Sequence, residues 1–208
     1  FGAAIDYNAY TDDEIAGKGG RDDWDKGYHD TNKDGKIDLT TELNFGHSQN
    51  AAKRDRGDSG TDLTKEAFDA FLTGRQIIHD ANQEELSPAQ LTALQGESEK
   101  AILAWEKAIA ATVIHYIKSV LGDMNATDYD FYGHAKHWSE LKGFALSFQF
   151  NPRSPITLDR FNQLHTKIGE QPVLPGQDGF DAYKTSLQQA SELLQETYGF
   201  TEENVTAW

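Results

Sequence analysis

After residue 60, apolar positions recur every three to four residues, the spacing that gathers them on one face of an α-helix. The first such pattern predicts a helix over 61–80. Thr61 or Asp62 is placed to cap its start, and Glu66 supports an N-terminal turn. Its apolar positions are Leu63, Ala67, Ala70, Phe71, Ile77 and Ile78.

A much longer helix is expected to begin at Ser87-Pro88, because Ser can cap a helix and Pro suits its first turn. Only Gly96 interrupts the pattern before Leu121, and we expect Gly122 to end the helix. A helix of about 30 residues would be roughly 45 Å long, the length of a bundle spine. Its apolar stripe consists of Ile102, Trp105, Ile109, Val113, Tyr116 and Val120.

Three further helices are expected, and no stretch alternates with the period of a β-strand. The first covers 134–150 and is ended by Asn151-Pro152, and the second begins at Thr157. The last covers 178–198 and is stopped by Gly199. The sequence therefore predicts an all-α fold, an up-down helical bundle over 61–208.

The first 60 residues lack this regular pattern. Gly17-Lys18-Gly19-Gly20 is a break, and the polar stretch 44–60 is expected to be an irregular surface loop. We therefore expect one helical domain over 1–208, in which an irregular segment, 1–60, precedes the bundle.

Composition narrows the possible partners. The 34 acidic and 19 basic residues give a net charge of −15, which argues against nucleic acids and anionic membranes as partners. The charge is compatible with cation binding, as it is with an ordinary acidic protein. The absence of Cys excludes disulfides, zinc-thiolate sites and a Cys nucleophile. No apolar run approaches the ~18 residues of a transmembrane helix.

An acidic segment following residue 29 matches the entry side of an EF-hand calcium loop. Side-chain oxygens fall at loop positions 1, 3 and 5, Gly at 6, a backbone carbonyl at 7, an aliphatic residue at 8 and an acid at 9. These positions are filled by Asp30, Asn32, Asp34, Gly35, Lys36, Ile37 and Asp38. We expect one Ca²⁺ here, acting as a structural clamp; an Asx-rich turn without an ion is the alternative.

The sequence does not decide which residue supplies the closing ligand of this loop. An EF-hand has a bidentate Glu at position 12, where this chain has Thr41, followed by Glu42. Either the exit backbone shifts to bring Glu42 to the ion, or Asp38 ligates directly, or the loop binds weakly.

A second candidate metal site lies on the predicted helix 134–150. His137 and Glu140 are spaced i, i+3 and share a face, as in metal sites of helical bundles, and His134 precedes His137 by one turn. His115 and Glu106 on the long helix are possible facing ligands. The alternatives are a surface His–Glu pair and a core histidine. The zinc-peptidase, nucleophile-elbow and phosphate-loop motifs are all missing from the sequence.

Four blocks in order resemble the bacterial domain-of-unknown-function family 4856, which is similar to the imelysin-like helical lipoproteins. They are FLTGRQII at 71–78, WEKAIAATVIHY at 105–116, HWSELKGF at 137–144 and FQFNP at 148–152. The likeness spans most of residues 1–155. The opening Phe1-Gly-Ala-Ala-Ile5 resembles the tail of a second copy of the histidine motif, which implies that the chain is the C-terminal portion of a larger duplicated bundle.

The resemblance implies a place in the periplasm or outer membrane and a link to iron acquisition, and peptidase activity has been attributed to some imelysin-like proteins. Their Gly-x-His-x-x-Glu motif is only approached here, since Gly133 precedes His134 while Glu140 follows His137.

We therefore expect a non-enzymatic, extracytoplasmic calcium-binding protein, linked to iron acquisition or ligand binding and associated with outer-membrane or other envelope proteins. Iron or zinc would be the second ion. A metallopeptidase using His137 and Glu140, or a structural or adhesive surface module, is the alternative.

Overall fold

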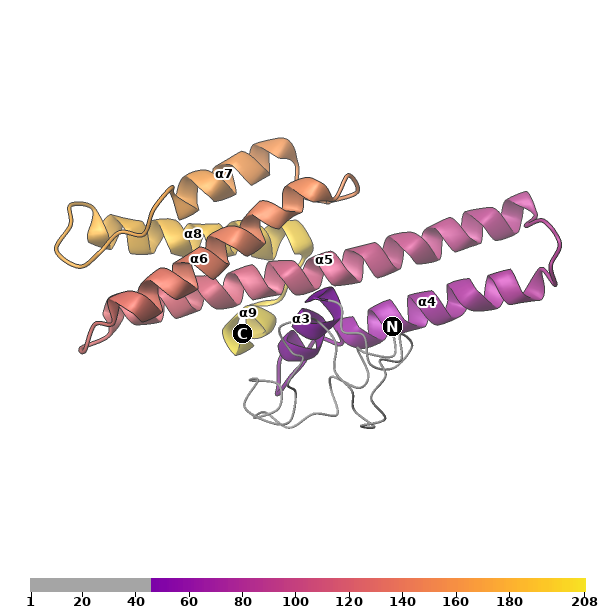
Figure 1. The fold of residues 1–208 in the computed structure, drawn as a ribbon, viewed down its shortest axis with the longest axis horizontal. Helices are drawn as coiled ribbons and strands as arrows, with labels where there is room; N and C mark the ends of the chain where they lie inside the picture. Colours follow the sequence, from indigo (N-terminus) through magenta and orange to yellow (C-terminus); the bar gives the residue numbers. More distant parts are fainter. Residues whose placement is uncertain (1–45) are drawn as a thin grey trace, which may run out of the picture. The chain divides into compact units, whose positions relative to one another are not determined.

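The structure is a computed structural model that describes residues 46–208. This part of the chain is all helical, with seven α-helices, one short 3-10 turn and no strand (Figure 1). The predicted all-α class is thus confirmed for the described residues. They divide into two compact units, and we treat each separately. The described parts of the hairpin unit are 46–56 and 61–108, and the bundle unit comprises 57–60 and 109–208.

The hairpin unit consists of α3 (Gly46–Arg54), α4 (Leu63–Asp80) and the first part of α5 (Pro88–Asn125). Two aspartate side chains accept hydrogen bonds from the first amides of α4. The Asp62 side chain accepts a hydrogen bond from the Lys65 amide at 3.2 Å, as predicted for a cap. Asp55 accepts bonds from the amides of Leu63 and Thr64 at 2.8 and 2.7 Å. The first amides of α4, which have no partner within the helix, are therefore satisfied by carboxylates.

The α4 and α5 helices of the hairpin run antiparallel (Figure 1). Ser87 and Gln90 form a reciprocal cap at the start of α5, as the Ser-Pro pair predicted: the Ser87 hydroxyl accepts from the Gln90 amide, and the Gln90 side chain accepts from the Ser87 amide. The helices approach closely at Gly74, where an added Cβ would lie 3.2 Å from the Leu94 side chain. Glycine at this position therefore permits the close packing of the hairpin.

Helix α3 corrects the prediction of an irregular loop over 44–60. Its sequence is polar except for Ala51 and Ala52, and both alanines are fully buried. Ala51 packs with Leu63 of α4 and Ala108 of α5. The helix is therefore stabilised by tertiary packing of two small residues, which a periodic pattern of large apolar residues cannot reveal.

The bundle unit contains the second part of α5 and four further helices, α6 (Phe131–Ser147), α7 (Leu158–Ile168), α8 (Phe180–Tyr198) and α9 (Glu202–Ala207). The short 3-10 turn η2 (Phe148–Phe150) ends α6. The fully buried residues of its core come from α5, α6, α7 and α8: Ala110, Ala111, Val113, Ile114, Val120, Leu141, Ala145, Leu164, Ile168, Leu187, Ala190 and Leu194.

Helix α6 begins at Phe131, three residues before its predicted start at 134, and two further features of this unit differ from the prediction. Helix α5 continues through Gly122 to Asn125, because Val120 and Met124 on its last turns are buried in the core and offset the ~1 kcal/mol cost of a helical glycine. Helix α9 was not predicted. It begins with a capping box formed by Thr201 and Asn204, and Asn204 also donates to the Ser59 carbonyl at 2.7 Å.

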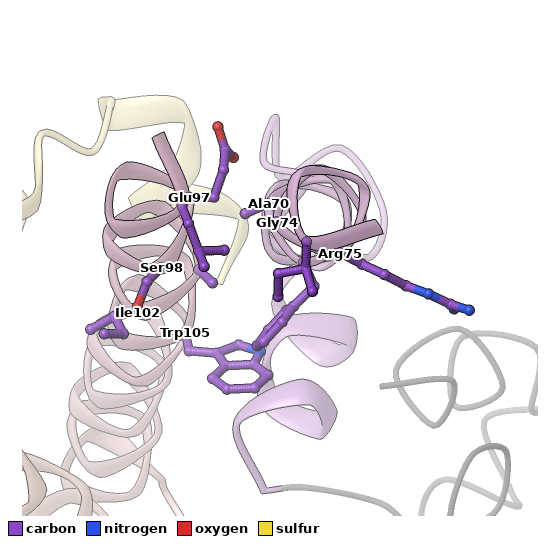
Figure 2. A pocket seen from close by; sticks show the side chains of 11 residues that line it. Ala70, Gly74, Arg75, Glu97, Ser98, Ile102 and Trp105 are labelled. Atoms are coloured by element: carbon purple, nitrogen blue, oxygen red, sulfur yellow. The ribbon is translucent and has the colours of Figure 1, made fainter. Parts of the chain in front are cut away.

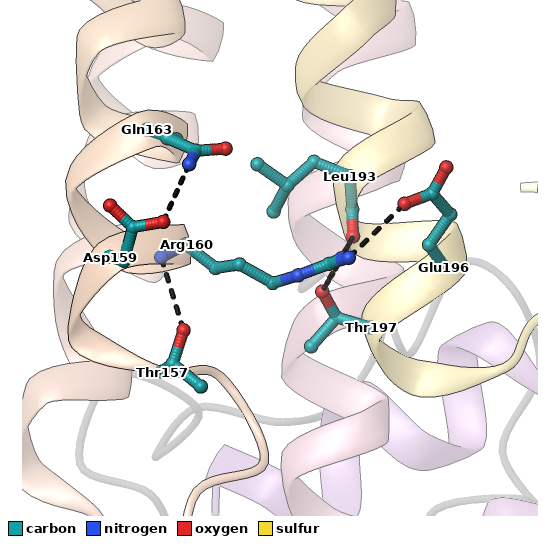
Figure 3. A network of polar contacts seen from close by, with 7 residues as sticks. All are labelled: Thr157, Asp159, Arg160, Gln163, Leu193, Glu196 and Thr197. Atoms are coloured by element: carbon teal, nitrogen blue, oxygen red, sulfur yellow. Dashed lines mark hydrogen bonds and ion pairs between the residues drawn. The ribbon is translucent and has the colours of Figure 1, made fainter.

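Arg160 of α7 links that helix to α8 (Figure 3). Its guanidinium donates to the Leu193 carbonyl at 3.3 Å and to the Thr197 hydroxyl at 2.9 Å, and it pairs with Glu196 at 3.3 Å. Thr157 caps α7 by accepting a hydrogen bond from the Arg160 amide, at the predicted start of this helix. None of the helices in residues 46–208 combines the length and the apolar character that crossing a membrane requires.

Candidate histidine–carboxylate site

The predicted second metal site lies in the bundle unit, where α5 ends and α6 begins. Asp130 caps α6 by accepting a hydrogen bond from the Tyr132 amide at 2.9 Å. The helix then presents His134, His137 and Glu140 at successive turns. The calcium-loop residues 30–42 lie outside the described residues, so that prediction stands on the sequence alone.

His137 forms a close contact with Asp123 on the last turn of α5. The distance from its Nδ1 to the carboxylate Oδ2 is 2.7 Å, and both side chains are partly exposed. A carboxylate can only accept a hydrogen bond, so Nδ1 must carry the proton. In the neutral ring, Nε2 is then the acceptor, with a lone pair available for a proton, a ligand or a metal ion.

His134 is fully buried beside this pair. Its Nδ1 lies 3.0 Å from the Tyr129 hydroxyl, and its Nε2 has no hydrogen-bond partner among the described residues. Burial lowers the pKa of His134, Asp123 partly offsets that effect, and His137 lowers the pKa further. His134 is therefore neutral at pH 7.

The hydroxyl of Tyr129 is protonated at pH 7, because its surroundings disfavour the negatively charged form. Burial raises the pKa of its hydroxyl, and the negative charges of Asp123 and Asp130 raise it further. The hydroxyl can therefore donate to the Nδ1 of His134.

Glu140 does not join this cluster. One of its carboxylate oxygens, Oε2, is buried without a hydrogen-bond partner in the part of the chain that the structure describes. Across residues 46–208, no three His, Asp or Glu side chains lie close enough together to hold a metal ion. The arrangement thus offers one oriented imidazole, His137, and no complete set of protein ligands within the described residues.

The other histidine and carboxylate considered as facing ligands are engaged elsewhere. His115 Nδ1 lies 2.9 Å from the backbone oxygen of Trp208, at the end of α9. Glu106 belongs to the hairpin unit and is buried there. Sequence reasoning missed Asp123 and Tyr129. Asp123 was detectable as the carboxylate nearest to the histidine helix along the chain, on the last turn of the preceding helix.

Comparison with known proteins adds no relative, since no family model, curated protein or solved structure matches the chain. The resemblance to imelysin-like proteins therefore stays a prediction from the four sequence blocks.

Proposed function

We propose that this chain is a non-enzymatic binding protein of the extracytoplasmic space, stabilised by one Ca²⁺ and linked to the acquisition of a second metal ion, iron in the first place. The calcium loop is the observation that carries the proposal. Asp30, Asn32 and Asp34 supply the side-chain oxygens of an EF-hand entry, Gly35 allows its turn, and Lys36 supplies a carbonyl. Asp38 and Glu42 would complete the shell, with Glu42 reaching the ion from one residue past the usual closing position.

The calcium ion would act as a clamp. Because the ion binds the folded loop and not the unfolded chain, the free energy of binding adds to the stability of the folded segment. A single loop of this kind is suited to holding a segment in place, whereas sensors use paired loops.

The bundle unit supports the link to a second metal ion. A metal-ligating histidine commonly donates its other ring N–H to a carboxylate, which fixes the tautomer and strengthens the ligand. His137 and Asp123 have this relationship at 2.7 Å. One imidazole makes a weak site by itself, so the ion would arrive with other ligands, as it does in a chelate or at an interface with an envelope protein.

The calcium proposal is tested on the purified full chain by elemental analysis and thermal unfolding. We expect about one Ca²⁺ per chain, a melting temperature that EDTA lowers, and recovery with added Ca²⁺. Asp34→Asn should abolish the response to EDTA, whereas Glu99→Gln, an exposed change on α5, should keep it. A wild-type chain without bound calcium, or a melting temperature that EDTA leaves unchanged, would refute the clamp.

The second candidate is a metallopeptidase that uses His137 and Glu140. The carboxylate-oriented imidazole of His137 favours it, because the same geometry serves a metal ligand and a general base. Hydrolysis of casein that is lost in both His137→Ala and Glu140→Gln would support this candidate. Hydrolysis that survives in Glu140→Gln, or none by the metal-loaded wild type, would exclude it.

A further inference from the structure

The hairpin unit contains an apolar groove between α4 and α5, with a volume of about 350 Å³. The groove is lined by Ala70, Gly74 and Ile78 of α4 and by Ala101, Ile102 and Trp105 of α5. The two helices approach closely at Gly74. Figure 2 labels four of these residues, Ala70, Gly74, Ile102 and Trp105. Arg75 also lines it, and in Figure 2 its side chain extends away from the helices.

A second hollow between the same two helices carries four charged side chains, and we call it the polar hollow. It is lined by Glu66, Asp69, Ala70, Thr73, Glu97, Lys100 and Leu103. Lys65 pairs with Asp69, and Lys100 pairs with Glu97 at 2.7 Å. Paired charges of this kind are typical of a helix surface that faces water, whereas an apolar stripe is typical of a surface that packs against another element. The hairpin is therefore amphipathic as a unit.

The apolar surface extends along the helices. Leu91 and Ile102 are about three turns apart on α5 and share a face, and Leu91 is 47% exposed. From Leu91 to Trp105 the α5 part of the surface is about 21 Å long, four turns of helix. On α4, Ile78 is 55% exposed and adds to the same surface. A long, narrow apolar surface between two helices matches the apolar face of a third helix.

Charge selects among the helices that could dock here. Residues 63–108 carry eight carboxylates and four basic side chains, and two of those bases, Lys65 and Lys100, are already paired. Two of the eight carboxylates, Glu84 and Glu85, are exposed in the turn between α4 and α5. A second copy of this chain would bring the same excess of negative charge to the groove, whereas a basic helix would complement it.

We propose that the apolar groove of the hairpin binds an amphipathic helix of a partner protein, with Leu-type residues on the apolar face and Lys or Arg on the polar face. The helix inserts its side chains at i, i+3, i+4 and i+7 between Ile78 of α4 and Ile102 and Trp105 of α5. This site is independent of the proposed metal function, because none of its residues belongs to the calcium loop or to the histidine helix.

The test uses the full chain with calcium and two synthetic helical peptides of about 14 residues, the length that spans the ~21 Å of the groove. Both peptides carry Leu at the same i, i+3, i+4 and i+7 positions, and their remaining positions are Lys in one and Glu in the other. We expect saturable binding of the Lys peptide by titration calorimetry, and binding of the Glu peptide weaker by about tenfold or more.

Variants at two adjacent positions locate the binding. Ile102→Glu lies in the groove, and Leu103→Glu lies in the polar hollow. Ile102→Glu should weaken the Lys peptide by about tenfold or more, while Leu103→Glu should leave its affinity within about twofold. Because Glu adds a negative charge, weaker binding of a cationic peptide can only reflect the lost apolar contact. Ile78→Glu and its control Leu72→Glu, both at exposed positions, repeat the comparison on α4.

Three results would overturn the proposal. The first is that the Lys peptide does not bind the wild type. The second is that Ile102→Glu and Leu103→Glu change the affinity of the peptide equally, which would show that binding is nonspecific and electrostatic. The third is that the wild type is a dimer by sedimentation and Ile102→Glu makes it a monomer, which would place a second copy in the groove. Circular dichroism of each variant confirms that its helices are intact. Failure of the calcium test leaves these outcomes unchanged.

Discussion

Trp138 of α6 donates a hydrogen bond from its indole Nε1 to the hydroxyl of Tyr183 of α8 at 2.9 Å. The same hydroxyl donates to the carbonyl of Ile168, the last residue of α7, at 2.7 Å. One buried oxygen thus connects three helices of the bundle unit. Burial raises the pKa of Tyr183 to about 12, with the Trp138 bond acting in the opposite direction, so the hydroxyl stays protonated and can serve both neighbours.

Tyr183→Phe is expected to destabilise the protein by about 1–3 kcal/mol. The substitution keeps the ring but leaves the Trp138 N–H and the Ile168 carbonyl buried without this partner, and an unsatisfied buried group costs more than a hydrogen bond gains. Urea unfolding measures the change. Tyr132→Phe is the matched control at a tyrosine that is 83% exposed, and it should change stability by less than about 0.5 kcal/mol. Equal effects of the two substitutions would contradict the buried-hydroxyl account.

The predicted helix starts succeeded where a short polar side chain stands directly before an apolar pattern, as at Asp62, Ser87 and Thr157. These starts are local, because the cap and the amide that it satisfies are a few residues apart. The Gly122 boundary was wrong because packing of Met124 into a distant part of the core decides it. A single sequence does not reveal such long-range contacts.

In the candidate site, too, the sequence predicted the local features and missed a contact between residues of different helices. The sequence placed His134, His137 and Glu140 on one helix, and they do lie on α6. It did not identify Asp123 as the partner of His137, because that pairing depends on how the chain reverses between α5 and α6. It also suggested that the three side chains share one ion. Their spacing over successive turns brings His137 to Asp123, while Glu140 lies a turn further along the helix.

The environment of His165 on α7 leads us to expect that stability depends on pH. Its ring lies 4.3 Å from that of Phe161, and neither ring nitrogen makes a hydrogen bond of good geometry in the described structure. Burial lowers the pKa of His165, with Lys142 acting in the same direction and the Ala145 carbonyl and Glu170 opposing. The unfolded chain therefore takes up a proton near the usual pKa of about 6.5 before the folded chain does, and stability is lost as the pH falls through the folded pKa.

His165→Phe should leave stability at pH 7 unchanged or slightly higher, since it replaces an unsatisfied polar ring with an apolar one of similar shape. It should also reduce the loss of stability below pH ~6.5, because the group that gains a proton on unfolding is gone. Urea unfolding at a series of pH values measures both effects. His79→Phe, a change at an exposed histidine of α4, is the control and should keep the wild-type pH profile. A steeper acid loss in His165→Phe would show that the pKa direction is wrong.

The contacts of Arg160 allow partly buried hydrogen bonds to be compared with an exposed ion pair (Figure 3). Arg160→Met keeps much of the apolar stem but removes the bonds to the Leu193 carbonyl and the Thr197 hydroxyl. We expect a loss of about 1–3 kcal/mol, because these are charged donors to partly buried acceptors. Glu196→Gln removes only the ion pair, whose glutamate is 70% exposed, and should cost less than about 0.5 kcal/mol. Similar losses in the two variants would assign the stabilisation to the ion pair instead.

Asp123→Asn tests whether the carboxylate prepares His137 for a metal ion. The amide can donate to Nδ1 as well as accept from it, so the substitution no longer fixes the proton on Nδ1 and removes the charge that strengthens Nε2 as a ligand. In the EDTA-treated chain resupplied with Ca²⁺, Zn²⁺ affinity should fall about 10–100-fold in Asp123→Asn and disappear in His137→Ala. Asp128→Asn, at an exposed carboxylate of the α5–α6 loop, should keep wild-type affinity. Zn²⁺ binding that is indifferent to Asp123→Asn but lost in Asp128→Asn would move the ion to the loop and reject the role assigned to His137.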